Sequence, residues 1–303
     1  MQREQPRCPR PLGEKLVHQA IAPALTDVAD DYEVRGRRLD KAPVLRIVDD
    51  MVQQGGSLEK RLEAAAQAIS GARFLTAFTG AGISVESGIP SFRGKDGLWS
   101  RYDPKVLEID YFAARPRECW PVIREIFYDH FLTARPNRAH LLLARLEERG
   151  LLKTLITQNI DDLHHQAGSR KVVEYHGNSR TLRCTACDRG YEAVSVDLKQ
   201  LPPRCSCGGV LKPDFVFFGE AIPPAAVIES ERAAGLTDVM ILIGTTGEVY
   251  PAAGLPRSAS ARGATIIEIN PEPSLYTNEI TDIFLQMPAG EAAAALQERL
   301  ERR

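Results

Sequence analysis

Short apolar runs alternate with stretches of helical spacing along most of this chain. Residues 58–69 place apolar side chains at helical intervals, and an apolar run at 74–78 follows. The same alternation recurs in apolar runs at 151–156, 239–243 and 265–269 and in helical stretches at 140–149 and 228–234. Short apolar runs of this kind are typical of strands that are buried on both faces of a parallel sheet. The pattern therefore predicts an α/β fold with a doubly wound parallel sheet.

Two segments interrupt this alternation, and a third precedes it. Residues 90–137 contain both tryptophans and several helical patches, which indicates a helical insertion, whereas residues 173–213 hold four cysteines and little core-forming sequence. We expect one domain over 58–303, divided into a core at about 58–89, 138–172 and 214–303, a helical insertion at about 90–137 and a small cysteine module at about 173–213. Residues 1–57 show no sustained period, and we expect an N-terminal extension of unknown role there.

Composition and charge argue against several classes of protein. The 303 residues are 44% hydrophobic, enough to bury a full core, and 38 Lys and Arg face 40 Asp and Glu. This balance provides no overall positive field that would attract nucleic acid or an anionic membrane. The sequence shows no apolar run near the ~20 residues that cross a bilayer and no apolar signal segment. We expect a soluble cytoplasmic protein with no direct contact to nucleic acid or membrane. The sequence does not indicate an oligomeric state.

A glycine turn follows the first predicted strand. Gly80 and Gly82 lie in the run 79–84 (TGAGIS), where glycines let backbone amides approach an anionic group and a following helix N-terminus adds positive charge. Such a turn can hold a pyrophosphate, although a tight turn without a ligand is an equally good interpretation. The fingerprint of hydride-transferring enzymes needs a third glycine, and Val85 occupies that position. An ordinary hydride-transfer site is therefore not expected.

Four of the six cysteines form two close pairs. Cys184 and Cys187 are separated by 17 residues (188–204) from Cys205 and Cys207. This spacing is typical of a zinc ribbon, in which two knuckles supply four thiolates to one Zn²⁺. The alternative of four buried free cysteines is weak, because chance rarely places two pairs at this spacing. Four thiolates leave no coordination position for water, so the predicted Zn²⁺ is structural.

Two polar segments follow the apolar run at 151–156. They are residues 157–164 (TQNIDDLH) and 174–178 (EYHGN). Because the first follows a buried strand, we expect it at the carboxyl edge of the sheet, where open α/β domains bind ligands. Asp161 is either a helix N-cap or a site carboxylate, and His176 is either an ordinary satisfied histidine or a general base. The residue types alone do not decide between these alternatives.

An ordered set of motifs resembles the sirtuin family of NAD-dependent protein-lysine deacylases. The motifs are GAGIS (80–84), GIPSFRG (88–94), TQNID (157–161), HGN (176–178), the two cysteine pairs, KPDFVFFGE (212–220), GTT (244–246) and EIN (268–270). The resemblance covers about residues 58–300. It implies a Rossmann-like sheet with a helical insertion and a zinc-ribbon module.

The resemblance also implies a site for NAD as co-substrate. The predicted cofactor-binding residues are the phosphate contacts Ala81, Gly82 and Arg93, the adenosine contacts Gly244, Thr245, Thr246 and Asn270, the nicotinamide pocket Ile89, Phe92, Asn159, Ile160 and Asp161, and the further residues Gly80, Ser84, Gln158 and Ala292. The glycine turn would supply amides to the phosphates, and Arg93 a charge-assisted pair of hydrogen bonds.

The family mechanism assigns a proton transfer to His176, with Asn159 and Asp161 as further catalytic residues. In this mechanism the acyl oxygen of a modified lysine attacks the ribose carbon as nicotinamide leaves, and a histidine then activates a ribose hydroxyl. The products are nicotinamide, free lysine and an O-acyl-ADP-ribose. An imidazole with an ordinary pKa of about 6.5 suits general-base work at neutral pH.

Acyl-lysine proteins or peptides are the substrates that the resemblance implies. The peptide would bind as an added β-strand between the segment Val216, Phe217, Phe218 and Gly219 and the segment that contains Val249. Recognition would then use backbone hydrogen bonds more than side chains. Low selectivity for the sequence around the lysine should follow.

The chain departs from the family pattern in two places. Members that remove succinyl, malonyl or glutaryl groups carry Tyr and Arg three residues apart, but here Phe131 stands three residues after Tyr128. A buried carboxylate without a cation costs several kcal/mol, so we expect poor activity on acidic acyl groups unless another register brings in Arg124. Acetyl or longer apolar acyl groups are the expected substrates. The second cysteine pair is Cys-x-Cys instead of the common Cys-x-x-Cys, which tightens that knuckle.

Two other functions remain as alternatives. NAD-dependent mono-ADP-ribosyl transfer to protein would use the same NAD cleavage with a protein nucleophile. A non-catalytic NAD-sensing or zinc-ribbon binding module would need no catalytic groups, and the presence of Asn159, Asp161 and His176 argues against it.

Overall fold

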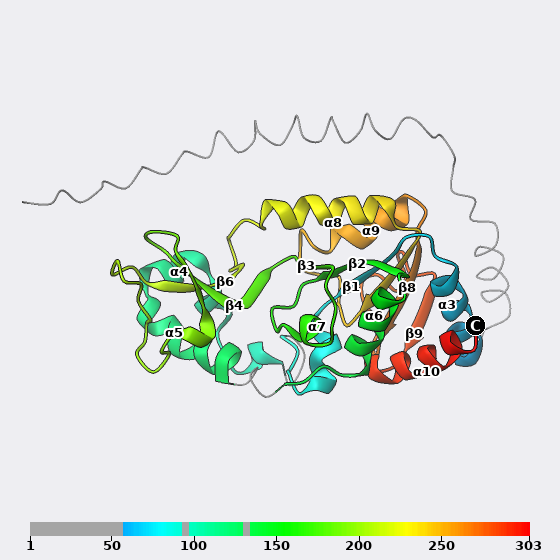
Figure 1. Cartoon of the computed structure of the whole chain (residues 1–303), viewed down its shortest axis with the longest axis horizontal. Coiled ribbons are helices and arrows are strands. Elements are labelled where there is room, and N and C mark those ends of the chain that lie inside the picture. The colour runs from blue at the N-terminus through cyan, green and yellow to red at the C-terminus, as the bar shows by residue number, and fades with distance from the viewer. Residues whose placement is uncertain (1–56, 93–96, 130–133) are drawn as a thin grey trace, which may run out of the picture. The chain divides into compact units, whose positions relative to one another are not determined.

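Two β-sheets organise the residues that the computed structural model describes, which are 57–92, 97–129 and 134–303. A large six-stranded sheet has the order β3-β2-β1-β7-β8-β9, and a small three-stranded sheet has the order β5-β4-β6. Figure 1 shows both sheets and the helices around them. The extension predicted at 1–57 lies outside the described residues, apart from Ser57, which caps the first described helix.

All strands of the large sheet run parallel. The strands are β1 (Leu75–Thr79), β2 (Leu152–Thr157), β3 (Val172–Glu174), β7 (Val239–Ile243), β8 (Thr265–Asn270) and β9 (Ile283–Gln286). β1 pairs with β2 on one side and with β7 on the other, and the chain then proceeds outward in both directions. The sheet is therefore doubly wound, as predicted. Its topological switch point, where such folds bind ligands, lies at the carboxyl ends of β1 and β7.

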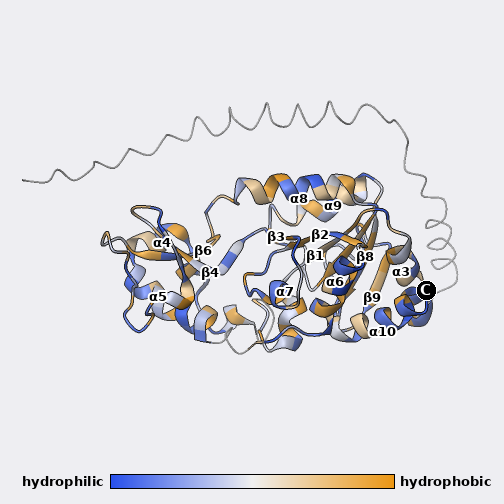
Figure 2. Cartoon of the chain, viewed as in Figure 1, coloured by the Kyte–Doolittle hydropathy of each residue, from blue (hydrophilic) through white to orange (hydrophobic). Residues whose placement is uncertain are grey.

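Helices cover both faces of this sheet. One face carries α3 (Leu58–Gly71), α6 (Arg138–Glu148) and α10 (Ala289–Glu301), and the other carries α8 (Pro224–Leu236) and α9 (Gly254–Ala261). Side chains of β7 alternate between the two cores: Ile241 packs with the first set of helices and Leu242 with the second. Figure 2 shows the apolar strands between helices of mixed polarity. Burial on both faces explains why β7 (VMILI) is entirely apolar and why β1, β2 and β8 contain apolar residues at half or more of their positions.

The helical insertion packs against the small sheet. The sheet consists of β4 (Gly177–Cys184), β5 (Gly190–Glu192) and β6 (Leu211–Phe215), all antiparallel. The insertion contains α4 (Ile109–Ala114), α5 (Pro116–Arg124) and a π-helical turn, Glu125–Asp129. Trp120 is fully buried between them and donates a hydrogen bond from Nε1 to the Leu211 carbonyl at 2.9 Å. The two insertions therefore share one apolar core.

Short helical turns complete the described fold. They are the 3₁₀ turns Ala81–Ser87, Leu98–Ser100, Pro104–Leu107 and Ala193–Ser195, and the α-helical turn α7 (Leu163–Gln166). The small sheet begins at Gly177 and ends at Phe215, slightly C-terminal to the module predicted at 173–213, because β3 belongs to the large sheet.

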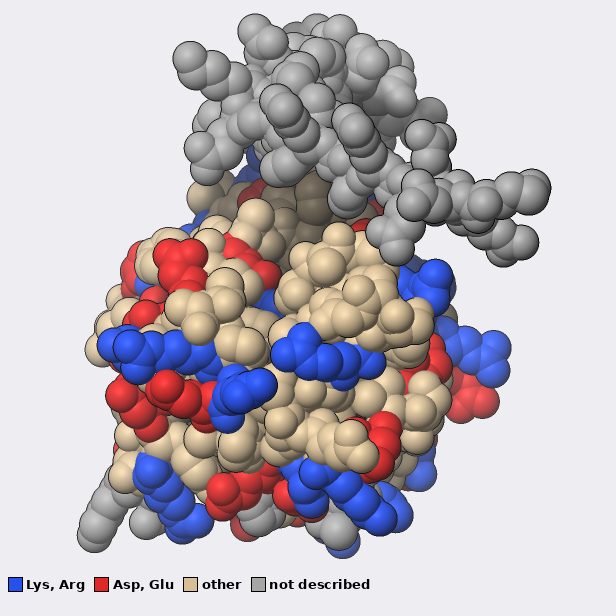
Figure 3. All heavy atoms as spheres, turned by 90° about the vertical axis from the view of Figure 1, so that its left-hand side faces the viewer, with Lys and Arg blue, Asp and Glu red and all other residues tan. Residues whose placement is uncertain are grey.

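On the face that bears this sheet, basic and acidic side chains are interspersed (Figure 3). Within the described ranges, no helix combines the length and apolarity needed to cross a membrane.

Candidate functional site

Two glycine turns meet at the switch point of the large sheet. The Gly80 and Gly82 amides donate to the carbonyls of Ile243 and Gly244 at 3.0 and 2.9 Å. A Cβ on Gly82 would lie 2.6 Å from the Gly244 Cα, and Gly244 itself has a φ of 64°. Gly82 has no space for a side chain, and Gly244 adopts a left-handed backbone conformation that favours glycine. The turns after β1 and β7, where Gly80, Gly82 and Gly244 are predicted to contact NAD, are thus in direct contact.

A buried polar cluster lies beside these turns. Ser84 Oγ donates to Asp161 Oδ2 at 2.6 Å, and Asn159 Nδ2 donates to both Ser84 Oγ and the Gly80 carbonyl at 3.2 Å. Burial raises the pKa of the Asp161 carboxyl, while hydrogen bonds from Ser84 and from the Leu163 amide oppose this. The Leu163 bond shows that Asp161 also supports the start of α7. The N-cap of α7 is Asp162, so Asp161 is not the helix N-cap itself but accepts from the first residue of the helix, and its role as a site carboxylate stays a prediction.

Two buried histidines extend this cluster and were not among the predicted site residues. His140 Nε2 lies 3.5 Å from Ser84 Oγ, and the His140 ring is 4.8 Å from the His164 ring. Burial lowers the pKa of His140 to about 4 and also lowers the pKa of His164, so both imidazoles are neutral at pH 7. His164 contacts the Thr79 hydroxyl, which bonds the Thr157 hydroxyl, which in turn accepts the Asn159 amide. This series of contacts fixes the backbone where residues 158–162, the candidate catalytic segment, begin.

His176 lies between β3 and β4, half buried. Its Nδ1 is 3.2 Å from the Gln158 carbonyl, which can only accept, so Nδ1 carries the proton and Nε2 keeps the basic lone pair. Burial lowers the pKa of His176, and the bond to Gln158 partly opposes the shift. Gln158 also donates from Nε2 to Thr245 Oγ1 at 3.1 Å. Gln158 thereby joins the candidate base to the predicted adenosine contacts.

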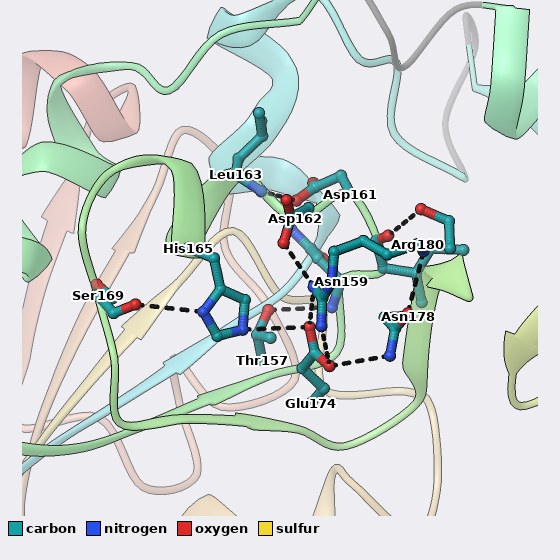
Figure 4. A network of polar contacts seen from close by, with 12 residues as sticks. Thr157, Asn159, Asp161, Asp162, Leu163, His165, Ser169, Glu174, Asn178 and Arg180 are labelled. Atoms are coloured by element: carbon teal, nitrogen blue, oxygen red, sulfur yellow. Dashed lines mark hydrogen bonds and ion pairs between the residues drawn. The ribbon is translucent and has the colours of Figure 1, made fainter. Parts of the chain in front are cut away.

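An arginine clamp holds the candidate catalytic segment against β4 (Figure 4). Arg180 contacts Asp162 Oδ1 at 2.5 Å and both carboxylate oxygens of Glu174 at 2.6 and 2.9 Å. His165 Nε2 lies 3.4 Å from the same Glu174 carboxylate. Asp162, His165 and Glu174 are close enough together to ligate a metal ion. Since the Arg180 guanidinium already pairs with both carboxylates and would repel a metal cation, we interpret the cluster as a structural ion-pair network.

The predicted cofactor residues come together from four strands. Residues 80–84, 158–161 and 244–246 follow β1, β2 and β7, and Asn270 ends β8 and donates from Nδ2 to the Thr245 carbonyl at 3.0 Å. Ile89 and Ile160 are buried beside them. Arg93 lies outside the described residues, and Phe92 is half buried with its ring 5.4 Å from Trp99. Ala292 differs from the others, because its side chain is fully buried in the aliphatic core under α10.

The four predicted zinc ligands converge at one end of the small sheet. The Sγ–Sγ distances are 3.5 Å for Cys184–Cys207, 3.6 Å for Cys187–Cys205 and 3.5 Å for Cys187–Cys207. Zn–S bonds of about 2.3 Å in a tetrahedron place sulfurs roughly 3.7 Å apart, so the cluster fits structural Zn²⁺. Tyr191 lies with its hydroxyl 3.0 Å from Cys205 Sγ. Zn²⁺ bound there would anchor β4, because β4 ends at Cys184.

The predicted peptide segment is held on one edge. Phe218 donates to the Leu107 carbonyl at 2.8 Å and accepts from the Ile109 amide at 3.0 Å. The Phe217 amide donates to Glu220 Oε2, which also pairs with Lys212 Nζ at 2.9 Å. Phe218 and Gly219 are exposed, and Val249 is half buried. An added strand would therefore have to use the edge of this segment that faces away from residues 107–109.

Tyr128 and Arg124 are the described side chains that bear on acyl selectivity. Tyr128 is buried and stacks on Trp120 at a ring distance of 6.1 Å, and its hydroxyl has no partner among the described residues. Arg124 bonds Asp129 at 3.2 Å and the Leu198 carbonyl at 3.2 Å. Phe131 lies outside the described residues. The second register considered for Arg124 gains no support, because its guanidinium is already paired.

Comparisons with known proteins agree on one family. A family model described as "Sir2 family" matches residues 80–251. The NAD-dependent protein deacylase of Aeropyrum pernix is 50% identical over 233 residues, which cover 76% of this chain and 94% of the relative. NAD-dependent protein deacylase 2 of Pyrobaculum aerophilum is 44% identical over 243 residues, 78% of this chain and 95% of the relative.

Solved structures resemble the described fold at similar coverage. A Sir2 homologue in complex with ADP-ribose matches with a TM-score of 0.75 and 43% identity, over 78% of this chain and 96% of that structure. A Sir2 protein with a deacetylated p53 peptide and 3′-O-acetyl ADP-ribose matches with a TM-score of 0.75 and 36% identity, over 78% and 97%. With a family model across more than half of its length and relatives of this identity, the chain belongs to the Sir2 family.

Proposed function

We propose that this chain is an NAD-dependent protein-lysine deacylase that transfers the acyl group to ADP-ribose and releases nicotinamide. The observation that carries the proposal is the position of His176, whose Nδ1 is held by the Gln158 carbonyl next to the buried Ser84, Asn159 and Asp161 cluster. A neutral imidazole whose Nε2 has no hydrogen-bond partner among the described residues can remove a proton from a ribose hydroxyl. The deacylase names of the relatives and the acetyl ADP-ribose bound in a solved Sir2 structure support the same chemistry.

Each group has a role that follows from its contacts. The glycine turns and the 244–246 segment would hold NAD, while Asn159 and Asp161, fixed by Ser84, would orient its nicotinamide end. The Arg180 clamp and the buried histidine chain are positioning groups that keep residues 158–162 in place. The four-cysteine Zn²⁺ site would anchor the strand that begins directly after His176.

The fate of the acyl group tests this function. Incubation of the protein with NAD and an acetyl-lysine peptide should give nicotinamide, free lysine and O-acetyl-ADP-ribose, detected by mass spectrometry. An unacylated protein that gains ADP-ribose instead would favour mono-ADP-ribosyl transfer. NAD that stays intact with every acyl peptide would favour a non-catalytic module.

Acyl selectivity is the first specific prediction. We expect acetyl-lysine and longer apolar acyl-lysine peptides to be processed at least about 100-fold faster, in kcat/KM, than a succinyl-lysine peptide. A succinyl carboxylate needs a buried cation, and Arg124 is committed to Asp129 and Leu198. Steady-state kinetics across acetyl, butyryl, fatty acyl and succinyl peptides measures this. Succinyl turnover equal to acetyl turnover would refute the prediction.

The pH dependence should reflect the buried base. Burial lowers the pKa of His176 below the ordinary value of 6.5, so the neutral, basic form persists to more acidic pH. We therefore expect kcat/KM to stay constant from pH 8 down to about 6.5 and to fall only at lower pH, as the imidazole becomes protonated. A pH profile in buffers of constant ionic strength measures the midpoint. An acid limb centred above 6.5 would assign it to another group.

A further inference from the structure

A fully buried carboxylate lies next to the predicted adenosine contacts. Glu268 on β8 has no exposed surface, and four neutral groups donate hydrogen bonds to it. Oε1 accepts from Asn270 Nδ2 at 3.0 Å and Ser274 Oγ at 2.5 Å, and Oε2 accepts from Thr277 and Thr281 Oγ1 at 2.9 and 2.7 Å. A carboxylate offers about four acceptor positions. All of them are used, so the cost of burying this group is met by neutral donors.

The donors fold the loop after β8 around Glu268. Ser274 Oγ also accepts the Tyr276 amide at 3.0 Å, and Thr277 Oγ1 accepts the Ser274 amide at 2.8 Å. The hydroxyls of Ser274 and Thr277 therefore link the Glu268 carboxylate to the backbone of the loop. The loop in turn donates from the Leu275 amide to the Thr246 carbonyl at 3.1 Å. Glu268 thereby supports Thr246, one of the predicted adenosine contacts.

Glu268 also fixes which way the Asn270 carboxamide faces. Asn270 Nδ2 donates one proton to Glu268 Oε1 and the other to the Thr245 carbonyl, both at 3.0 Å. Both partners can only accept, so the amide nitrogen must face them and the oxygen must face away. Within the described part of the chain, no hydrogen bond reaches Asn270 Oδ1. Asn270 therefore presents a hydrogen-bond acceptor.

We propose that Glu268 is a positioning residue for the adenosine half of NAD. It orients Asn270 so that Oδ1 accepts a hydroxyl of the adenosine ribose, and it holds the loop that supports Thr246. The inference rests on the proposed function, because it requires NAD at this edge of the sheet. It assigns to this chain a residue that shapes the cofactor site without touching the cofactor.

The variant Glu268→Gln tests the proposal with almost no change in volume. Glutamine offers one acceptor oxygen in place of two and carries no charge, so it accepts more weakly from the four donors, and the orientation of Asn270 is enforced less strictly. We expect the KM for NAD to rise about tenfold, while kcat at saturating NAD and the KM for acetyl-lysine peptide stay within about twofold. Glu279→Gln is the matched control: it makes the same change in the same loop, at a half-exposed carboxylate paired with Arg257. It should keep wild-type values.

NAD analogues that lack the 2′- or the 3′-hydroxyl of the adenosine ribose separate positioning from general damage. Wild type and Glu279→Gln should lose about tenfold in kcat/KM with one of the two analogues. For Glu268→Gln, kcat/KM with that analogue should be only slightly lower than the already reduced kcat/KM of this variant with NAD. Two results would overturn the proposal. One is an unchanged KM for NAD in Glu268→Gln, and the other is a fall in kcat/KM from NAD to the analogue that is as large in this variant as in wild type.

If Glu268→Gln does not fold, as judged by thermal melting and zinc content, two smaller changes test the positioning role of Glu268. Ser274→Ala and Thr281→Val each remove one donor to Glu268. Each should raise the KM for NAD about threefold without changing the KM for peptide, and no rise in either variant would overturn the proposal. Wild-type nicotinamide release in the same assay separates the two claims. An inactive wild type refutes the proposed function, whereas an active wild type with unaffected variants refutes only the positioning role.

Discussion

Replacement of His176 by alanine should reduce lysine deacylation by about 10³-fold or more, because general bases of this kind contribute roughly 10²- to 10⁴-fold. Among the described residues, the His176 side chain makes one hydrogen bond, from Nδ1 to the Gln158 carbonyl, and it is only half buried. Its removal should therefore leave the fold, the zinc content and NAD binding intact. Single-turnover assays with an acetyl-lysine peptide measure the loss.

His176→Gln is the control for the kind of role. A glutamine amide can still donate to the Gln158 carbonyl but cannot take a proton, so it should be as inactive as the alanine variant. Recovery of activity in His176→Gln would indicate that the position needs only a hydrogen-bond donor. Full turnover in His176→Ala would contradict the assignment of the base.

Loss of Zn²⁺ should unfold the small sheet and abolish activity. Structural Zn²⁺ sites contribute about 10–16 kcal/mol of binding free energy in zinc-finger peptides. Three Sγ–Sγ distances here are 3.5 to 3.6 Å, and without the ion the sulfur atoms would no longer be held together by metal bonds. β4 runs from Gly177, next to the candidate base, to the ligand Cys184. Chelation or Cys184→Ser should therefore remove zinc and displace His176 together. Zinc analysis, thermal melting and the deacylation assay measure these effects.

Cys119→Ala provides the matched control for the zinc prediction. Cys119 is a fully buried free cysteine on α5 and lies outside the zinc cluster. This variant should keep one zinc ion per chain and most of its activity. Retention of full activity by zinc-free Cys184→Ser would show that the module is not needed to hold the base.

The sheet could be predicted from the sequence because its strands are buried on both faces. The apolar runs predicted at 74–78, 151–156, 239–243 and 265–269 correspond to β1, β2, β7 and β8, with boundaries that differ by at most one residue at either end. The short strands β3 and β9 carried no comparable signal, since each is only a few residues long and lies at an edge. Periodicity reveals long central strands better than short edge strands.

The candidate site was predictable where a motif carries it and not where tertiary contacts create it. The cysteine pairs and the polar segment after β2 are local in sequence. In the structure the four cysteines cluster with one another, and Gln158 and Asn159 contact Thr245 and Ser84. His140 and Arg180 were not identified, and Glu268 was quoted only as part of the EIN motif without a role, because each acts through partners from other segments. A histidine within a helix or a glutamate within a strand gives no sign in sequence that serine or threonine hydroxyls from other segments will be its neighbours.

Titration of NAD into purified, zinc-loaded protein tests the central claim most directly. The claim is that the turns after β1 and β7, with residues 158–161 and Asn270, form one dinucleotide site beside His176. Calorimetry should show one NAD bound per chain, displaced by ADP-ribose and unaffected by His176→Ala. Absence of NAD binding by the folded, zinc-containing protein would contradict the account.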